Sequence, residues 1–270
     1  MTFLLSTMAT DSAAVDVLIT RPSGEAAQTL CRAVDALGHR SHHLPLLELH
    51  SLGDPDAEQQ ELLASLSTCQ HLIFISGNAV RFGMRWIASY CPVLPVGVQC
   101  YAIGDATAAQ LAQHGLQALT PGQDMHSEGL LGLASLQQVA GDHVVIVKGM
   151  GGRGTLRQTL ERRGAQVSEL MCYRRARPNL PDGALAQALL ERSIDVIMVS
   201  SGEGLVNLRE LLSPEETTKF IDICLIVPSE RVAQTANDAG FTRVVTADNA
   251  SDAAMLRALE AWHPGHGEAS

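Results

Sequence analysis

The chain has 270 residues, which exceeds the usual size of a domain with a single hydrophobic core, so two lobes are expected. Its 29 acidic residues outnumber its 19 basic ones, and the formal net charge of −10 disfavours binding to nucleic acid or anionic membranes. Only 4% of the residues are aromatic, which argues against a surface that stacks single-stranded bases. An anionic ligand would therefore have to be held by local donors.

Cysteine usage and the start of the chain point to the cytoplasm. The six cysteines form no C-x-x-C pair and no zinc spacing, so each is expected to behave as a small apolar side chain. Residues 1–14 lack the basic start and the long apolar core of a signal peptide. No apolar stretch approaches the roughly 18 residues of a membrane span, and no long apolar surface stripe stands out. We expect a cytoplasmic monomer.

Short apolar strands alternate with amphipathic helices along the chain. A strand is predicted over 17–20, and a helix follows over 25–37 and ends at Gly38. Another strand over 72–75 precedes a helix that starts after Gly77. This alternation predicts parallel sheets joined by right-handed crossovers, so the expected fold class is α/β.

The second half of the chain repeats the first. Four blocks recur at an offset that stays between 124 and 127 residues. The paired blocks are 17–20 with 144–147, 73–77 with 197–202, 106–115 with 231–240, and 127–131 with 251–255. So constant an offset over four blocks predicts an internal duplication, and hence two similar lobes.

Six loops at the predicted carboxyl ends of the strands are rich in Gly, Ser and Thr. They are 21–24, 76–78, 104–107, 149–154, 200–203 and 229–231. Ligands of parallel sheets bind at this edge, where helix N-termini present free N–H groups and glycine lets the backbone approach an anion. Each polar side chain alone is explained better as a helix N-cap. Six such loops together favour an anion-binding cleft between two lobes.

The segment 149–154 matches the dinucleotide pattern G-x-G-x-x-G, after a strand and before a helix. The acid that should hold the ribose belongs at the end of the next strand. Glu169 lies near the start of that strand, and Tyr173, Arg174 and Arg175 occupy its end. We therefore expect no dinucleotide, and no Gly-Lys-Ser/Thr follows for a Walker A loop.

The ten histidines offer no pair with metal-ligand spacing on a helix. His42 and His43 are neighbours on a predicted strand, so their side chains face opposite ways. His263 and His266 lie in a tail rich in proline and glycine, which is expected to be disordered. No metal site is predicted, and the chain has no G-x-S-x-G elbow of a hydrolase.

Tyr173 is one of three tyrosines, ends the predicted strand 167–173 and precedes two arginines. A phenol at a strand end can reach a cleft and act as a proton donor, because a tyrosine hydroxyl is protonated at neutral pH. Position alone favours equally an amphipathic strand residue with its hydroxyl in water.

Eight short motifs follow one another along the chain. They are Ile19-Thr20-Arg21-Pro22, Phe74-Ile75-Ser76-Gly77-Asn78-Ala79-Val80, Ala102-Ile103-Gly104-Asp105-Ala106-Thr107-Ala108, Lys148-Gly149-Met150-Gly151-Gly152-Arg153, Arg163-Gly164-Ala165, Cys172-Tyr173-Arg174-Arg175, Val199-Ser200-Ser201-Gly202-Glu203 and Ser229-Glu230-Arg231. Their order and spacing resemble the uroporphyrinogen-III synthase family in its proteobacterial form. The resemblance runs from about Val17 to Leu259, so it covers nearly the whole chain.

The resemblance implies two α/β lobes joined by a two-stranded linker, with the first strand–helix–strand unit exchanged between lobes. Carried onto this sequence, lobe one combines residues 1–46 with 176–270, and lobe two spans 49–174. The chain would cross near Leu47-Glu48 and Arg175-Ala176. The active-site cleft would lie between the lobes.

The resemblance also implies a hydro-lyase that closes hydroxymethylbilane to uroporphyrinogen III without a cofactor. Water is lost, and ring D is inverted through a spiro intermediate. Tyr173 is the implied proton donor to the departing hydroxyl. The candidate substrate-binding residues are Arg21, Ser76, Gly77, Asn78, Gly104, Thr107, Gly149, Gly151, Gly152, Ser200, Ser201, Gly202, Ser229 and Arg231. At Arg231 some relatives carry threonine.

Backbone N–H groups of these loops would pair with a polycarboxylate without adding charge, which reconciles an anionic substrate with an acidic chain. Two alternatives from other classes stay open at this stage. A non-catalytic two-lobed ligand-binding module would leave the cyclisation of hydroxymethylbilane unchanged. A nucleotide-dependent oxidoreductase would bind NAD or NADP.

Overall fold

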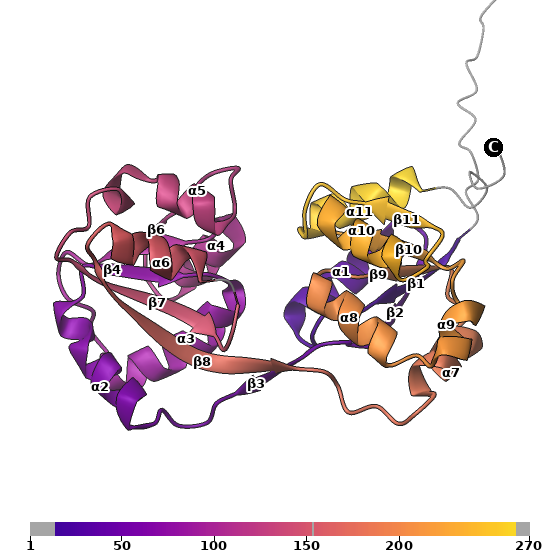
Figure 1. The fold of residues 1–270 in the computed structure, drawn as a ribbon, viewed down its shortest axis with the longest axis horizontal. Helices are drawn as coiled ribbons and strands as arrows, with labels where there is room; N and C mark the ends of the chain where they lie inside the picture. The colour runs from indigo at the N-terminus through magenta and orange to yellow at the C-terminus, as the bar shows by residue number, and fades with distance from the viewer. Residues whose placement is uncertain (1–13, 153, 263–270) are drawn as a thin grey trace, which may run out of the picture. The chain divides into compact units, whose positions relative to one another are not determined.

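The structure, a computed structural model, describes residues 14–152 and 154–262. The predictions for the N-terminal segment and for His263 and His266 lie outside these residues, as does Arg153 of the glycine-rich motif. The chain divides into two units. Unit 1 combines the residues up to Glu48 with those from Ala176 onward, and unit 2 is Leu49–Arg175. Figure 1 shows the indigo start of the chain in the same unit as its orange and yellow end.

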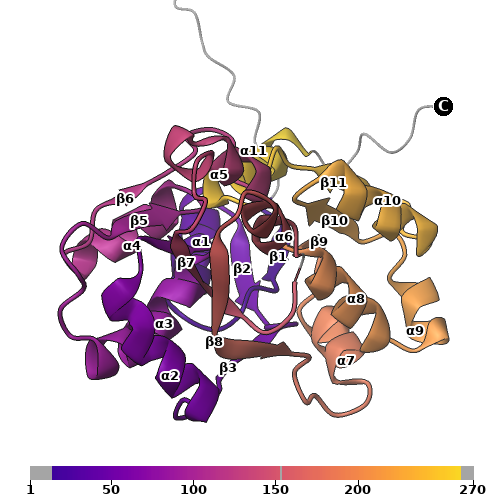
Figure 2. The ribbon, with the colours of Figure 1, turned by 60° about the vertical axis from the view of Figure 1, so that its left-hand side comes forward.

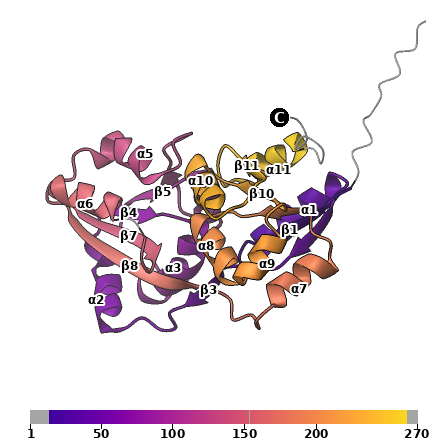
Figure 3. The ribbon, with the colours of Figure 1, turned by 45° about the vertical axis from the view of Figure 1, so that its right-hand side comes forward.

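Unit 1 is built on a parallel five-stranded sheet in the order β11-β10-β9-β1-β2. Its strands are β1 (Asp16–Ile19), β2 (Arg40–His43), β9 (Val196–Met198), β10 (Cys224–Val227) and β11 (Val244–Thr246). Its helices are α1 (Glu25–Ala36), α7 (Ala184–Glu191), α8 (Gly202–Glu210), α9 (Pro214–Lys219), α10 (Glu230–Asp238) and α11 (Asp252–Ala261). Helices α7, α8 and α10 cover one face, and α1 and α11 cover the other (Figure 3).

Unit 2 is built on a six-stranded sheet in the order β3-β8-β7-β4-β5-β6, parallel from β8 to β6. Its strands are β3 (Glu48–Ser51), β4 (His71–Phe74), β5 (Gln99–Ala102), β6 (Ala118–Leu119), β7 (His143–Gly149) and β8 (Gln166–Ala176). Its helices are α2 (Ala57–Ser65), α3 (Gly77–Tyr90), α4 (Asp105–Gln113), α5 (Ser127–Gly132) and α6 (Thr155–Arg162), with short 3-10 turns at Leu66–Thr68 and Ala134–Leu136. Helices α2, α3 and α4 cover one face, and α5 and α6 cover the other (Figure 2).

The aliphatic strands explain why both sheets are covered on two faces. In β7 the run Val144–Val147 is at most 2% exposed at every residue, as a strand buried on both sides must be. The alternation of strands and helices therefore predicted the α/β class correctly. Within the described residues, no helix is both long and apolar enough to cross a membrane.

The two sheets correspond in strand order and in register. Val17 of β1 lies opposite Val196 of β9, and Val144 of β7 lies opposite His71 of β4. These two pairs are related by the offsets of 127 and 125 residues seen in the sequence. In each unit, the strand pair that opens one half of the chain joins three strands of the other half. Duplication stays a prediction, and this match supports it.

Candidate functional site

Tyr173 lies within β8 and does not end it. The strand continues to Ala176, so the predicted end at Tyr173 is wrong. Pairing with β7 is interrupted by a bulge between Lys148 and Gly149, which places Tyr173 opposite Gly149. Beyond that point β8 still has β3 at its other edge. Just after β3, the Leu52 N–H donates to the carbonyl of Cys172, next to Tyr173. This second neighbour, distant in sequence, explains the extra length.

The Tyr173 side chain is buried, with only 1% of its surface exposed. Its hydroxyl lies 3.2 Å from Ser76 Oγ, where either oxygen can donate. Its ring stacks on Phe82, with centroids 5.2 Å apart and planes inclined by 24°. The Arg175 guanidinium carbon lies 6.0 Å from the ring centroid. The phenol is thus held by unit 2 through both its ring and its hydroxyl.

Ser76 is the N-cap of α3. Its Oγ accepts a hydrogen bond from the Ala79 N–H at 3.0 Å, which satisfies one free donor of the first turn. A serine hydroxyl can accept twice and donate once. Ser76 can therefore form hydrogen bonds with Ala79, Tyr173 and one further group. Its hydroxyl lies at the positive end of a helix dipole. Unlike Tyr173, Ser76 is only half-buried.

The glycines at the end of β7 and in the loop after it serve different purposes. Gly149 is buried, and a Cβ atom there would lie 2.6 Å from Tyr173 Cζ. Gly151 and Gly152 have φ angles of +75° and +90°, with open space around the position of a Cβ. Position 149 therefore requires glycine because a side chain would clash with Tyr173. Positions 151 and 152 favour glycine because their φ angles are positive.

The acid that a dinucleotide would need is already engaged. Glu169 Oε1 accepts from Lys148 Nζ at 2.8 Å, and the two side chains are only 16% and 8% exposed. Arg157 adds a second positive charge 3.7 Å from the other carboxylate oxygen. A ribose would have to displace a largely buried ion pair, so the geometry does not favour the oxidoreductase alternative.

The other predicted positions in unit 2 lie at the starts of α3 and α4. Gly77 and Asn78 form the first turn of α3 and are half-buried. Gly104 precedes α4, and its carbonyl accepts from the N–H of the buried Thr107 at 3.0 Å. A Cβ on Gly104 would lie 2.7 Å from Met125 Sδ, so this glycine also admits a neighbouring side chain.

In unit 1, Arg21 joins three strand-end segments. Its Nε donates to Ser200 Oγ at 2.9 Å, and one Nη donates to the carbonyl of Ala250 at 2.7 Å. The other Nη forms an ion pair with Asp252 at the start of α11. Arg21 is 13% exposed, so its guanidinium is occupied by the protein. A substrate carboxylate would have to compete with these partners.

The remaining predicted positions in unit 1 lie at the starts of α8 and α10. Ser201 caps α8 by accepting from the Gly204 N–H at 3.1 Å, as Ser76 caps α3, and Gly202 is the first residue of that helix. Ser229 precedes α10 and is half-buried, whereas Arg231 is exposed in its first turn. The loops of both units thus end at helix N-termini, as the anion-binding hypothesis expects.

His42, His43 and Cys172 have structural surroundings. Within 14–152 and 154–262 no cluster of His, Cys, Asp or Glu is suited to a metal ion. His42 Nε2 lies 2.8 Å from Asp16 Oδ1, while His43 Nε2 lies 2.9 Å from the carbonyl of Arg21. Burial raises the pKa of the Cys172 thiol, next to Tyr173, to about 12, so it stays a thiol.

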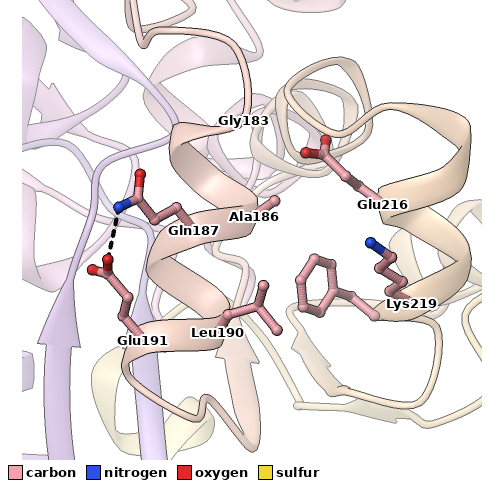
Figure 4. A pocket seen from close by; sticks show the side chains of 8 residues that line it. Gly183, Ala186, Gln187, Leu190, Glu191, Glu216 and Lys219 are labelled. Carbon is pink, nitrogen blue, oxygen red and sulfur yellow. Dashed lines mark hydrogen bonds between the residues drawn. The ribbon is translucent and has the colours of Figure 1, made fainter.

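A cavity of about 300 Å³ lies elsewhere in unit 1, between α7 and α9 (Figure 4). Leu190 and Phe220 form part of its apolar wall, while Glu191, Glu216 and Lys219 supply its charged groups. Two carboxylates against one ammonium suit a polycarboxylate poorly. None of the predicted site residues lines this cavity.

The family model for uroporphyrinogen-III synthase HemD matches residues 28–257. The uroporphyrinogen-III synthase of Escherichia coli (strain K12) is 34% identical over 250 residues, which cover 91% of this chain and 100% of that protein. The one of Salmonella typhimurium (strain LT2) is 35% identical over 257 residues, with the same coverage. The chain belongs to the uroporphyrinogen-III synthase family. The resemblance seen in the order of the motifs is confirmed.

Solved structures of the family share the fold. A mutant uroporphyrinogen III synthase from the extremely thermophilic bacterium Thermus thermophilus matches with a TM-score of 0.58 at 20% identity, covering 92% of this chain and 99% of that chain. A uroporphyrinogen-III synthetase from Helicobacter pylori 26695 matches with a TM-score of 0.58 at 14% identity, covering 91% and 98%. At these identities the likeness supports the two-sheet α/β architecture.

The structure brings Tyr173, Ser76 and Gly149 together in unit 2. Two partners were missed by sequence reasoning. Phe82 is one apolar residue within the apolar stripe of α3, and nothing in the pattern distinguishes it from core. Asp252 stands in the first turn of α11, where an acid is typical for the helix dipole alone.

Replacing Arg21 tests its role as a tie between loops. We expect Arg21→Met to lower the free energy of unfolding by about 2 kcal/mol, because hydrogen bonds to charged groups are lost and the partly buried Asp252 loses its counter-charge. Arg231→Met, at an exposed site, should change it by less than about 0.5 kcal/mol. Urea unfolding of both variants measures the difference, and equal stabilities would contradict this role.

Proposed function

We propose that the chain converts hydroxymethylbilane to uroporphyrinogen III with Tyr173 as the proton source and with the strand-end loops as the carboxylate-binding sites. Membership of the uroporphyrinogen-III synthase family supports the reaction. The observation that carries the mechanism is the pairing of Tyr173 with Ser76 at the N-terminus of α3.

The first step needs a proton on the departing hydroxyl. Tyr173 is buried and Ser76 is half-buried, so the serine is the member of the pair nearer to solvent. Ser76 donates its proton as the substrate's carbon–oxygen bond breaks, water leaves, and Tyr173 donates its own proton to Ser76 Oγ. The azafulvene cation left behind keeps its charge on a pyrrole ring.

This step leaves Tyr173 as a charged tyrosinate, which is unfavourable in a buried position. It forms next to the N-terminal end of α3, whose partial positive charge stabilises it. Ring closure through the spiro intermediate releases one proton from the rearranged pyrrole, and Tyr173 recovers it. Protons therefore balance over the cycle, with water as the sole by-product and without a redox step. We propose that the enzyme works as a cytoplasmic monomer without a cofactor.

Orientation is the second contribution. Hydroxymethylbilane also closes unaided to the uninverted isomer, so the enzyme must hold the chain in the fold that leads to the spiro intermediate. We propose that the free N–H groups at the starts of α3, α4, α8 and α10 bind its carboxylates.

Tyr173→Phe tests the proton source. Phenylalanine keeps the ring that stacks on Phe82, so the variant should fold, while kcat should fall by roughly 10²–10⁴-fold with loss of a general acid. The rate is measured by incubating the variant with enzymatically generated hydroxymethylbilane and analysing the isomers of the product. A wild-type rate of uroporphyrinogen III formation would remove Tyr173 from the mechanism.

Ser76→Ala and Ser201→Ala form a matched pair. Both remove a helix N-cap bond, so each should cost about 1 kcal/mol of stability. Ser76 also contacts the Tyr173 hydroxyl, so Ser76→Ala should lower kcat, whereas Ser201→Ala should act mainly on KM. Steady-state kinetics separate the two effects. If both variants lower kcat equally, the proton path through Ser76 is wrong.

A further inference from the structure

Gly149 leaves room for the hydroxyl end of Tyr173. Its backbone lies outside the left-handed region, so an alanine could adopt the same conformation. A Cβ there would nevertheless lie 2.6 Å from Cζ, 2.7 Å from Cε2 and 3.1 Å from Cε1 of Tyr173. Cζ carries the hydroxyl and the other two carbons flank it. The missing side chain therefore makes space for the reactive end of the ring.

The backbone around this contact has little freedom to move. The bulge before Gly149 sets it opposite Tyr173, and the Met150 N–H donates to the Tyr173 carbonyl at 2.8 Å. Gly149 is buried, as are the four residues before it. A side chain at position 149 would therefore have to be accommodated by the Tyr173 ring.

Phe82 supports the ring from α3. It is 7% exposed, and its ring stacks on Tyr173 at a centroid distance of 5.2 Å. The Arg81 guanidinium carbon lies 4.4 Å from the Phe82 centroid, which helps to hold that ring in place. The same helix carries Ser76 as its N-cap, so α3 positions both the ring and the partner of its hydroxyl.

We infer that Gly149 and Phe82 are positioning residues that set the Tyr173 hydroxyl on Ser76, an inference that rests on the proposed role of Tyr173. Gly149 belongs to a glycine-rich motif whose pattern suggests a bound phosphate or carboxylate. The geometry assigns this glycine to the phenol instead, and leaves Gly151 and Gly152 to shape the loop. Neither Gly149 nor Phe82 needs to touch the substrate.

The test is a double-mutant cycle with the phenol hydroxyl. Gly149→Ala should displace the ring and lower kcat about 10²-fold, since a misplacement of about 1 Å can cost that much, while KM stays within about twofold. In a Tyr173→Phe background, the same substitution should change kcat by less than about threefold, because the hydroxyl it misplaces is already gone. Phe82→Leu should likewise lower kcat in the wild type and change it little in the Tyr173→Phe background. This variant provides the test if Gly149→Ala does not fold.

Gly83→Ala is the matched control. A Cβ at Gly83 would lie 2.4 Å from Val147 Cγ1 and 3.7 Å from Cys172 Sγ, so it strains the same interface between α3 and the sheet, and its nearest contacts are not with the Tyr173 ring. We expect it to lower the melting temperature at least as much as Gly149→Ala while kcat stays within about threefold of wild type. A general loss of packing would affect the two glycine variants alike.

The outcomes separate this inference from the proposed function. Equal loss of kcat on Gly149→Ala with and without the Tyr173 hydroxyl would overturn the positioning role and leave the proton source intact. A loss of kcat in Gly83→Ala as large as in Gly149→Ala would also overturn it. Full activity of Tyr173→Phe alone would overturn the proposed proton source, and the positioning role with it.

Discussion

The hydrogen bond between Tyr173 and Ser76 is the interaction on which the proposed mechanism depends. It joins β8 to the first turn of α3, and it places a phenol beside the positive end of a 14-residue helix. The surroundings serve this contact, because Phe82 supports the ring and Gly149 leaves it space. A weak acid thereby gains a defined acceptor and a stabilised conjugate base.

The two units share a design but differ in chemistry. Ser76 and Ser201 cap equivalent helices, and the offset of 125 residues that relates them also relates Phe82 to Asn207. In unit 1 that asparagine donates to the carbonyl of Leu46, and the three tyrosines of the chain all lie within 49–175. Both units can present helix N-termini to an anion, but the phenol belongs to unit 2. Under the proposed function, proton transfer therefore belongs to unit 2.

Sequence periodicity predicted most of the fold and the loops, but few of the contacts. Buried aliphatic strands and helix starts are local features, so the α/β class and positions such as Ser76 and Ser201 could be read directly. The length of β8 beyond Tyr173 depends on β3, which is more than a hundred residues away in the chain. The pairing of Arg21 with Asp252 spans an even longer separation. Such contacts are set by tertiary packing, which a single sequence does not encode in its local pattern.

The most direct measurement is NMR of the protein labelled with ¹³C at tyrosine Cζ, because the chain has only three tyrosines. Tyr90 is 44% exposed, Tyr101 is fully buried beside His71, and Tyr173 faces Ser76. We expect the Tyr173 signal to shift in Ser76→Ala, and to shift in the wild type on binding a linear tetrapyrrole that lacks the hydroxymethyl group. The Tyr90 and Tyr101 signals should stay unchanged. A Tyr173 signal that responds to neither change would contradict the account.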